Sequence, residues 1–430
     1  MGEKGNMMIK EPRISLFDLV SSLSIAMDLV DSSVVNHQKR VAYIAYFIAL
    51  ECGLDQNECI KILLAGFLHD CGVLSLEEKL SALEFEFGTD GKECEKHSII
   101  GYQLLNDIPL VSNIARLVRY HHVRWEDRDN PVWKEPIPVG SHILFLADRI
   151  EVSIKRNEEI LGQVKRILKR IEEESGRMFD PKLVEIFKTI SQQECFWLDL
   201  VSPFIDTVLA RKLDTRLIEM NMHELLDIAR LFYKIIDFRS TFTATHSIGV
   251  ATSAETIAGL AGFSETERKM MLIAGYLHDL GKLAVPTEIL EKNGALNDQE
   301  VHIIKSHTYY TYRILEGING METINTWASF HHERLNGNGY PFHLKGDKLP
   351  LGSRVLAVAD VFTALTEDRP YRKAMFKDKV LEIMERMAEN RNLDSFVVYL
   401  LRNNFDEIDS VRKTAQAEVL KDYRNLWLIE

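Results

Sequence analysis

Residues 277–283 read Leu-His-Asp-Leu-Gly-Lys-Leu, and this short stretch decides how the rest of the chain is interpreted. Residues 68–74 read Leu-His-Asp-Cys-Gly-Val-Leu, nearly the same pattern 209 positions earlier. A single histidine also precedes each His-Asp pair by 32 residues, at His37 and at His246. Matching patterns at a fixed offset indicate an internal duplication, so we expect two structural units of the same kind.

The repeat continues downstream of both His-Asp pairs. A further histidine follows the first pair by 28 residues and the second by 29, a double histidine begins 24 residues later, and an Ala-Asp pair closes each set. The first set comprises His37, His69, Asp70, His97, His121, His122 and Asp148; the second comprises His246, His278, Asp279, His307, His331, His332 and Asp360. Because chance placement does not give such matching intervals, we divide the chain into residues 1–209 and residues 210–430.

Most of the chain is predicted to be helical. Apolar residues recur every three or four positions, as in residues 41–48 and 270–277, which is the period of a helix with a buried face. Alternating patterns typical of strands are scarce. With 46% hydrophobic and 27% charged residues, the composition is that of an ordinary globular protein. We therefore expect an all-α fold of two tandem helical bundles.

The shared residue set is suited to binding metal ions. A lone histidine is more often a packing residue, but seven ligand-type residues in register, found twice, favour coordination. Imidazole and carboxylate donors without cysteine suit Fe, Mn, Co, Ni or Zn rather than a structural zinc cage. The set exceeds what one ion needs, so we expect two divalent transition-metal ions that share a carboxylate. Ions about 3.5–4 Å apart can activate a hydroxide for in-line phosphoryl displacement.

The C-terminal half resembles a known family. Residues 331–341, His-His-Glu-Arg-Leu-Asn-Gly-Asn-Gly-Tyr-Pro, are similar to the HHExxxGxGYP motif of the HD-GYP subgroup of the HD phosphohydrolase superfamily. Residues 278–282, 358–362 and 369–372 match this subgroup too, and the resemblance covers about residues 225–410. It implies a helical bundle that hydrolyses a cyclic dinucleotide, cyclic di-GMP or 3′,3′-cyclic GMP-AMP, to a linear 5′-phosphorylated product. Fe or Mn is expected ahead of Ni, Co or Zn.

The resemblance also implies a role for each matching residue. One ion would be held by His246, His278, Asp279 and Asp360. The second would be held by His307, His331 and His332, with Asp279 as the bridging ligand. Catalysis would depend on Asp279 and on Lys282, a point cation on the scissile phosphate. The substrate contacts would be Lys282, Gly339, Tyr340 stacked on a base, Thr363, and Arg369 and Arg372 on the distal phosphate.

Two positions depart from the family pattern. Phe242 stands four residues before the first histidine ligand, where members with a third metal ion have glutamate, so two ions are expected. Thr363 stands three residues after the last ligand, where many members have an aspartate close to the substrate. This second difference leaves the preference between cyclic di-GMP and cyclic GMP-AMP open.

The N-terminal half keeps the seven ligand-type residues and lacks the other motifs. Val73 stands in place of the lysine, no GYP loop follows His122, and no Arg-Pro-Tyr-Arg segment follows Asp148. We interpret this half as a degenerate HD domain with a structural, regulatory or dimer-forming role, which binds metal without hydrolysing a cyclic dinucleotide. The alternative is that its histidines are inherited packing residues.

The remaining features narrow the partners and the cellular setting. A formal charge of −12 argues against DNA binding but not against a small anionic ligand. No stretch reaches the roughly 18 apolar residues of a membrane span, and the N-terminus has no signal-peptide core. The five cysteines form no CxxC pair, which favours reduced thiols. We expect a cytoplasmic homodimer without a membrane span.

Two other functions stay open at this point. One is a catalytically weak signalling module that binds cyclic dinucleotides or docks onto diguanylate-cyclase-type (GGDEF) domains. The other is a different HD-type activity, such as a nucleotidase or a di-iron oxygenase. The intact ligand set and Lys282 weigh against the first, and the GYP loop with its downstream arginines weighs against the second.

Overall fold

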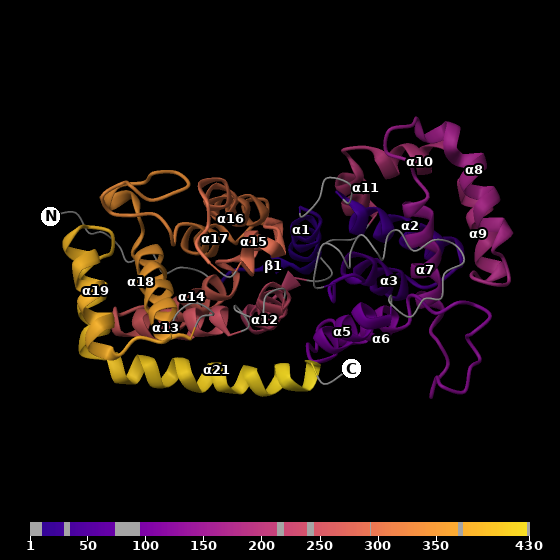
Figure 1. The fold of residues 1–430 in the computed structure, drawn as a ribbon. Coiled ribbons are helices and arrows are strands. Elements are labelled where there is room, and N and C mark those ends of the chain that lie inside the picture. Colours follow the sequence, from indigo (N-terminus) through magenta and orange to yellow (C-terminus); the bar gives the residue numbers. More distant parts are fainter. Residues whose placement is uncertain are drawn as a thin grey trace. The chain divides into compact units, whose positions relative to one another are not determined.

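The computed structural model is almost entirely helical over the residues that it describes, which are 11–29, 35–73, 95–212, 219–238, 245–292, 294–368 and 373–427 (Figure 1). The expectation of an all-α chain is confirmed. Within these ranges the one sheet is an antiparallel pair, β1 (Ile14–Ser15) with β2 (Glu219–Met220), in which Ile14 is opposite Met220. No helix in the same ranges is both long and apolar enough to span a bilayer.

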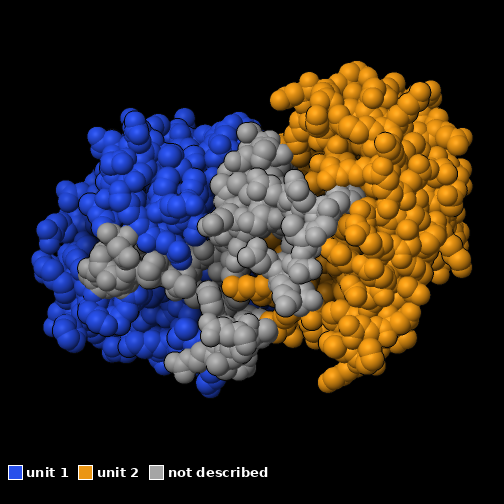
Figure 2. Space-filling view, turned by 45° about the vertical axis from the view of Figure 1, so that its right-hand side comes forward, with its two compact units in different colours: residues 1–19, 219–430 blue, residues 20–218 orange. Residues whose placement is uncertain are grey.

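The chain divides into two compact units, coloured separately in Figure 2. Unit 1 comprises residues 1–19 and 219–430, and unit 2 comprises residues 20–218. A division after residue 209 would cut α11 (Ile205–Lys212), whose Leu209 is buried. The N-terminal segment belongs to unit 1 because β1 pairs with β2 and because the Glu11 carboxylate accepts a hydrogen bond from the Met222 amide.

Unit 2 is a helical bundle centred on α2. Its helices are α1 (Leu16–Asp28, which begins in unit 1), α2 (His37–Glu51), α3 (Gln56–Leu68), α5 (Glu95–Asn106), α6 (Ser112–Arg119), α7 (Val139–Val152), α8 (Ile160–Glu173), α9 (Pro181–Ser191), α10 (Glu194–Val201) and α11. The α2 helix is buried along most of its length because it packs against α3, α7 and α9. Side-chain caps fix where helices begin: Asp55 caps α3, and Asp180 caps α9.

Unit 1 is a second bundle, centred on α13. Its elements are α12 (Met222–Phe238), α13 (His246–Leu260), α14 (Glu265–Leu277), η3 (Leu280–Ala284), α15 (Thr287–Leu290), α16 (Asp298–Glu316), α17 (Glu322–Ser329), η4 (Gly346–Lys348), α18 (Leu351–Thr366), α19 (Lys377–Glu389), α20 (Ser395–Asn403) and α21 (Phe405–Trp427). Capping boxes at Ser264 and Asn297 begin α14 and α16. The long α21 helix, yellow in Figure 1, packs along α13.

The sequence repeat is also a structural repeat. The bounds of α2 and α13, and those of α3 and α14, are each separated by 209 residues, the offset of the two His-Asp pairs. The helices α5, α6 and α7 correspond in order to α16, α17 and α18. Asp180 and Asp394 also play the same part in the two units, because each caps the next helix, α9 in one unit and α20 in the other.

Two glycines in each unit let the ligand-bearing segments approach closely. A Cβ added at Gly275 would lie 2.4 Å from the Ala251 Cα, so α13 and α14 touch backbone to backbone. A Cβ added at Gly281 would lie 1.9 Å from the His307 carbonyl oxygen, which locks η3 against α16. Gly66 and Gly72 make the equivalent contacts in unit 2. Close packing of these segments therefore requires a glycine in each His-Asp-x-Gly sequence.

We predict that Gly281→Ala destabilises unit 1 and impairs metal binding, because the methyl group cannot fit unless α16 and its His307 move away. Overpacking of this kind typically costs about 1–3 kcal/mol. Thermal unfolding and metal content of the full chain measure the two effects. The control is Gly317→Ala, since Gly317 has helical backbone angles and open space around its Cα. Equal unfolding temperatures for the two variants would contradict the packing argument.

Candidate metal centre

The seven candidate ligands of unit 1 lie at the ends or on the inner faces of its central helices. His246 is the first residue of α13, His278 directly follows α14, and Asp279 precedes η3. The other four lie on the second half of the repeat: His307 on α16, His331 and His332 just after α17, and Asp360 on α18. Packing of these helices brings together residues that are spread over more than 100 positions.

A hydrogen bond within the same helical turn orients three of these histidines. The Nδ1 of His278 donates to the Gly275 carbonyl at 2.7 Å, and the Nδ1 atoms of His307 and His331 each donate to the carbonyl three residues earlier at 2.6 Å. With Nδ1 protonated, each Nε2 presents its lone pair to the interior. The buried Nε2 of His278 has no hydrogen-bond partner. Its lone pair is therefore a potential ligand that a metal ion would satisfy.

The Asp279 carboxylate lies between His278 and His307, which belong to different groups of potential ligands. Its Oδ2 is 3.2 Å from the His278 Nε2, and its Oδ1 is 3.4 Å from the His307 Nε2. Three groups of residues each place their ligand atoms within 4.8 Å of one another. They are His246, His278 and Asp360; His278, Asp279 and His331; and His307, His331 and His332. Such an arrangement fits two ions that share the Asp279 carboxylate.

At His307, His332 and Asp279, electrostatics favours the protonation states that bind metal. Burial is the main reason that the pKa of His307 falls to about 4 and that of His332 to about 3. Burial alone would raise the pKa of the Asp279 carboxyl, but its interactions with His278 and Lys282 outweigh burial and hold that pKa well below its usual value. Neutral imidazoles next to an ionised carboxylate are ready to coordinate a cation.

The orientation of His246 is set by Asp360 and by Glu367, a residue that was not predicted from the sequence. Its Nδ1 lies 3.0 Å from the Glu367 Oε2, and its Nε2 lies 3.2 Å from the Asp360 Oδ1. Glu367 accepts a hydrogen bond from Gln416 of α21, and Gln416 in turn accepts one from the buried Arg412 at 2.6 Å. A carboxylate behind a ligating histidine fixes the tautomer and strengthens the ligand.

Asp237 also supports this site and was not predicted from the sequence. Its carboxylate accepts hydrogen bonds from the Ser247 amide at 3.1 Å and from the Ser247 hydroxyl at 2.7 Å, which fixes the start of α13 beside His246. The repeat contained a signal for it, because Asp28 precedes His37 by nine residues, as Asp237 precedes His246.

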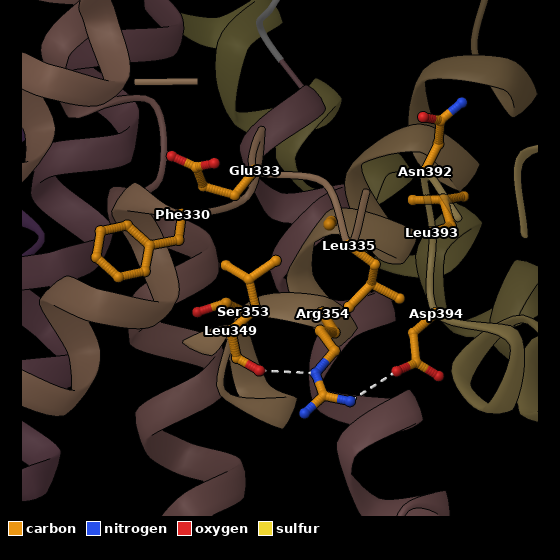
Figure 3. A pocket seen from close by; sticks show the side chains of 10 residues that line it. Phe330, Glu333, Leu335, Leu349, Ser353, Arg354, Asn392, Leu393 and Asp394 are labelled. Carbon is orange, nitrogen blue, oxygen red and sulfur yellow. Dashed lines mark hydrogen bonds and ion pairs between the residues drawn. The ribbon is translucent and has the colours of Figure 1, made fainter. Parts of the chain in front are cut away.

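The GYP loop is held in place by Glu333, the residue after the double histidine. Its buried carboxylate accepts hydrogen bonds from the amides of Phe342 at 2.6 Å and Leu344 at 2.9 Å. Beneath the loop, Arg354 donates to the Leu349 carbonyl and to Asp394 (Figure 3). The cavity there is only about 10 Å³, room for a single water at most, so these contacts support the loop rather than bind a ligand.

An open cavity of about 400 Å³ lies over the ligands. Its lining includes His246, Asp279, Lys282, His307, His332 and Asp360. The Lys282 Nζ is 2.6 Å from the Asp279 Oδ2, so a cation is held where a phosphate would approach. The Tyr340 ring packs on His332 at 4.9 Å between ring centroids.

Gly339 and Thr363 are not among the residues that line this cavity. Gly339 approaches the backbone of Glu333 so closely that an added Cβ would lie 2.5 Å from the Glu333 Cα. Thr363 is fully buried. Arg369, Arg372 and Phe242 lie outside the described residues.

Unit 2 gathers its seven residues in a similar way. His69 and His121 donate from Nδ1 to the carbonyl three residues earlier, at 2.8 and 2.6 Å. The His97 Nε2 lies 3.4 Å from the His121 Nε2 and 3.0 Å from the His122 Nε2. The groups that could hold an ion are His37, His69 and Asp70, and His97, His121 and His122. Neither group includes Asp148.

Comparison with known proteins places the chain in a family. Residues 230–397 and, separately, residues 34–153 match families described as HD domain. The chain is 31% identical over 405 residues to the 3′3′-cGAMP-specific phosphodiesterase 1 of Vibrio cholerae, an alignment that covers 92% of this chain and 93% of the relative. The chain therefore belongs to the HD-GYP family of the HD phosphohydrolase superfamily, with a further HD domain in its N-terminal half.

Two other similarities differ in how much of the chain they cover. A cyclic di-GMP phosphodiesterase response regulator of Xanthomonas campestris is 37% identical over 150 residues, 34% of this chain and 40% of that protein. The crystal structure of a cyclic GMP-AMP specific phosphodiesterase of Vibrio cholerae aligns with a TM-score of 0.64 at 25% identity. That alignment covers 92% of this chain and 98% of the solved chain.

We predict that Glu367→Gln weakens metal binding, because the neutral amide supports the His246 Nδ1–H less well than the carboxylate does. Loss of such a supporting group typically lowers metal affinity or activity by roughly 10–100-fold. Titration of the metal-free full chain with Mn²⁺ measures the change. Glu382→Gln, at an exposed site on α19, is the matched control. Unchanged affinity in Glu367→Gln would show that Glu367 does not support the ligand.

Proposed function

We propose that unit 1 is a metal-dependent phosphodiesterase that opens a cyclic dinucleotide to a linear, 5′-phosphorylated dinucleotide. The observation that carries the proposal is the position of the Asp279 carboxylate between His278 and His307, in the lining of a cavity of about 400 Å³ that Lys282 also lines. A site with two ions, one bridging carboxylate and a lysine cation beside that carboxylate suits the cleavage of a phosphodiester. The similarity to phosphodiesterases over most of the chain supports the same reaction.

We propose 3′,3′-cyclic GMP-AMP as the preferred substrate and cyclic di-GMP as the second candidate. The relative and the solved structure that align over at least nine-tenths of this chain are both named for cyclic GMP-AMP. The cyclic di-GMP phosphodiesterase of Xanthomonas campestris aligns over 34% of the chain. Thr363, where many members have aspartate, is a further difference from the common family pattern.

The ligand set fits two divalent transition-metal ions, for which we propose Fe or Mn ahead of Ni, Co or Zn. One ion would be held by His246, His278, Asp279 and Asp360, and the other by Asp279, His307, His331 and His332. When bound, they supply the Lewis acidity that activates water and offsets charge on the phosphate.

The residues of the chain would position the substrate around these ions. Lys282 lies at the cavity wall, where its ammonium group can neutralise a phosphate oxygen. Tyr340 is fixed against His332 and offers its ring to a base. Gly339 keeps the loop in close contact with Glu333, and Arg369 and Arg372 would bind the distal phosphate.

The roles of unit 2 and of protein partners are also proposals. Unit 2 has valine where unit 1 has Lys282, and it has no GYP loop, so we propose a structural or regulatory role for it. Homodimer formation and docking onto GGDEF domains remain predictions from the sequence.

The test is to incubate the full chain with 3′,3′-cyclic GMP-AMP and with cyclic di-GMP in the presence of Mn²⁺, and to separate the products by chromatography. We expect a linear product from the unchanged chain, with faster turnover of cyclic GMP-AMP. Asp279→Asn should abolish hydrolysis because the amide cannot bridge two cations. Turnover of more than a few per cent in folded Asp279→Asn would falsify the assignment.

Lys282→Ala should lower turnover while the metal content stays unchanged. Removing one preorganised charge from an active site typically costs on the order of 10²–10³ in rate, and the Lys282 ammonium donates to Asp279 without being a ligand itself. Elemental analysis and a turnover assay on the same sample separate the two effects. Lys379→Ala, an exposed change on α19, is the control. If the metal content falls together with turnover, Lys282 supports the metal site rather than the substrate.

A further inference from the structure

The two units differ in the residue that follows the last aspartate of each set. Val361 follows Asp360 on α18 and lines the cavity of unit 1. Arg149 follows Asp148 on α7 and is only 1% exposed, which makes it one of the largest fully buried side chains of the protein. A permanent cation thus lies beside the ligand set of unit 2, where unit 1 has an apolar side chain.

The Arg149 guanidinium pairs with one carboxylate oxygen of Asp148. In unit 1 the corresponding oxygen of Asp360 faces a histidine of the ligand set instead. The Arg149 Nη2 and Nε lie 2.6 and 3.1 Å from the Asp148 Oδ2. In unit 1 the same oxygen, Oδ2 of Asp360, faces the His332 Nδ1 at 4.0 Å, and Asp360 groups with His246 and His278. Among the described residues, no ligand group includes Asp148.

The predicted bridging position in unit 2 is altered as well. The buried Gln38 donates from Nε2 to the Asp70 Oδ2 at 3.0 Å. The residue at this position in unit 1 is Ser247, whose hydroxyl is directed away from the ligands to Asp237. The Asp70 Oδ2 therefore accepts from a neutral side-chain amide, whereas the Asp279 Oδ2 accepts from the Lys282 ammonium.

We infer that the Arg149 guanidinium takes the place of one metal ion in unit 2, which leaves this unit at most one ion. Arginine stays charged at physiological pH, so a metal ion beside Asp148 would meet a fixed positive charge. The ion would also have to displace a buried ion-pair partner, and a buried charge left without its partner is strongly unfavourable. The sequence predicted that unit 2 binds metal as unit 1 does, and the position of Arg149 limits unit 2 to one ion at most.

The test counts and locates Mn²⁺ in the full chain after excess ions have been removed by gel filtration. Elemental analysis gives the number of ions, and anomalous scattering from crystals gives their positions. We expect the unchanged chain to hold at most one ion in unit 2, and Arg149→Val to gain a further ion beside Asp148. Arg149→Lys, which keeps a positive charge, should gain none. The reciprocal change Val361→Arg should remove an ion from unit 1.

Two Mn²⁺ ions in unit 2 of the unchanged chain would overturn the inference, and so would a folded Arg149→Val protein that gains no ion. If Arg149→Val does not fold, the ion count of unit 2 in the unchanged chain and the Val361→Arg variant decide the question. A Val361→Arg protein that retains both ions in unit 1 would contradict the inference. Ions in unit 1 report on the proposed function and ions in unit 2 on this inference, so the two can fail independently.

Discussion

The metal centre depends on one repeated hydrogen bond, from the Nδ1 of a histidine to the carbonyl oxygen three residues earlier. It occurs at His278, His307 and His331 in unit 1, and at His69 and His121 in unit 2. Because donor and acceptor belong to the same helical turn, the helix itself fixes the ring and its tautomer, and each Nε2 is directed inward. The position of each donor atom is then set by how closely the helices pack, which explains why small residues such as Gly275 and Gly281 lie at their contacts.

The sequence predicted the features of the structure that depend on regular spacing between residues. The helical period gave the all-α fold, and the spacing of histidines and aspartates gave two sets of residues that the fold does bring together. The intervals are informative because the ligands sit at fixed places on helices whose order and length are repeated. A recurring interval could even have revealed Asp28 and Asp237, which lie nine residues before His37 and His246.

Residues that act from unrelated positions could not be predicted in this way. Glu367 supports His246 in unit 1, whereas Glu151 supports His37 in unit 2 at 2.7 Å from its Nδ1. Glu151 lies three residues after the last aspartate of its set and Glu367 lies seven after, so alignment of the two halves hides their shared role. Arg149 was missed for a different reason, since an arginine beside an aspartate in a helix is most often a surface residue and only its burial gives it significance.

The contact between α21 and Glu367 ties the catalytic half to the last part of the chain. Gln416 lies more than 100 residues beyond His307 in sequence, yet it is hydrogen-bonded to the carboxylate that orients His246. The α21 helix also packs along α13, the central helix of the bundle. A chain shortened before Gln416 would therefore lose both the support for His246 and part of the packing on α13. During synthesis, the same dependence would delay maturation of the metal site until translation of α21 had finished.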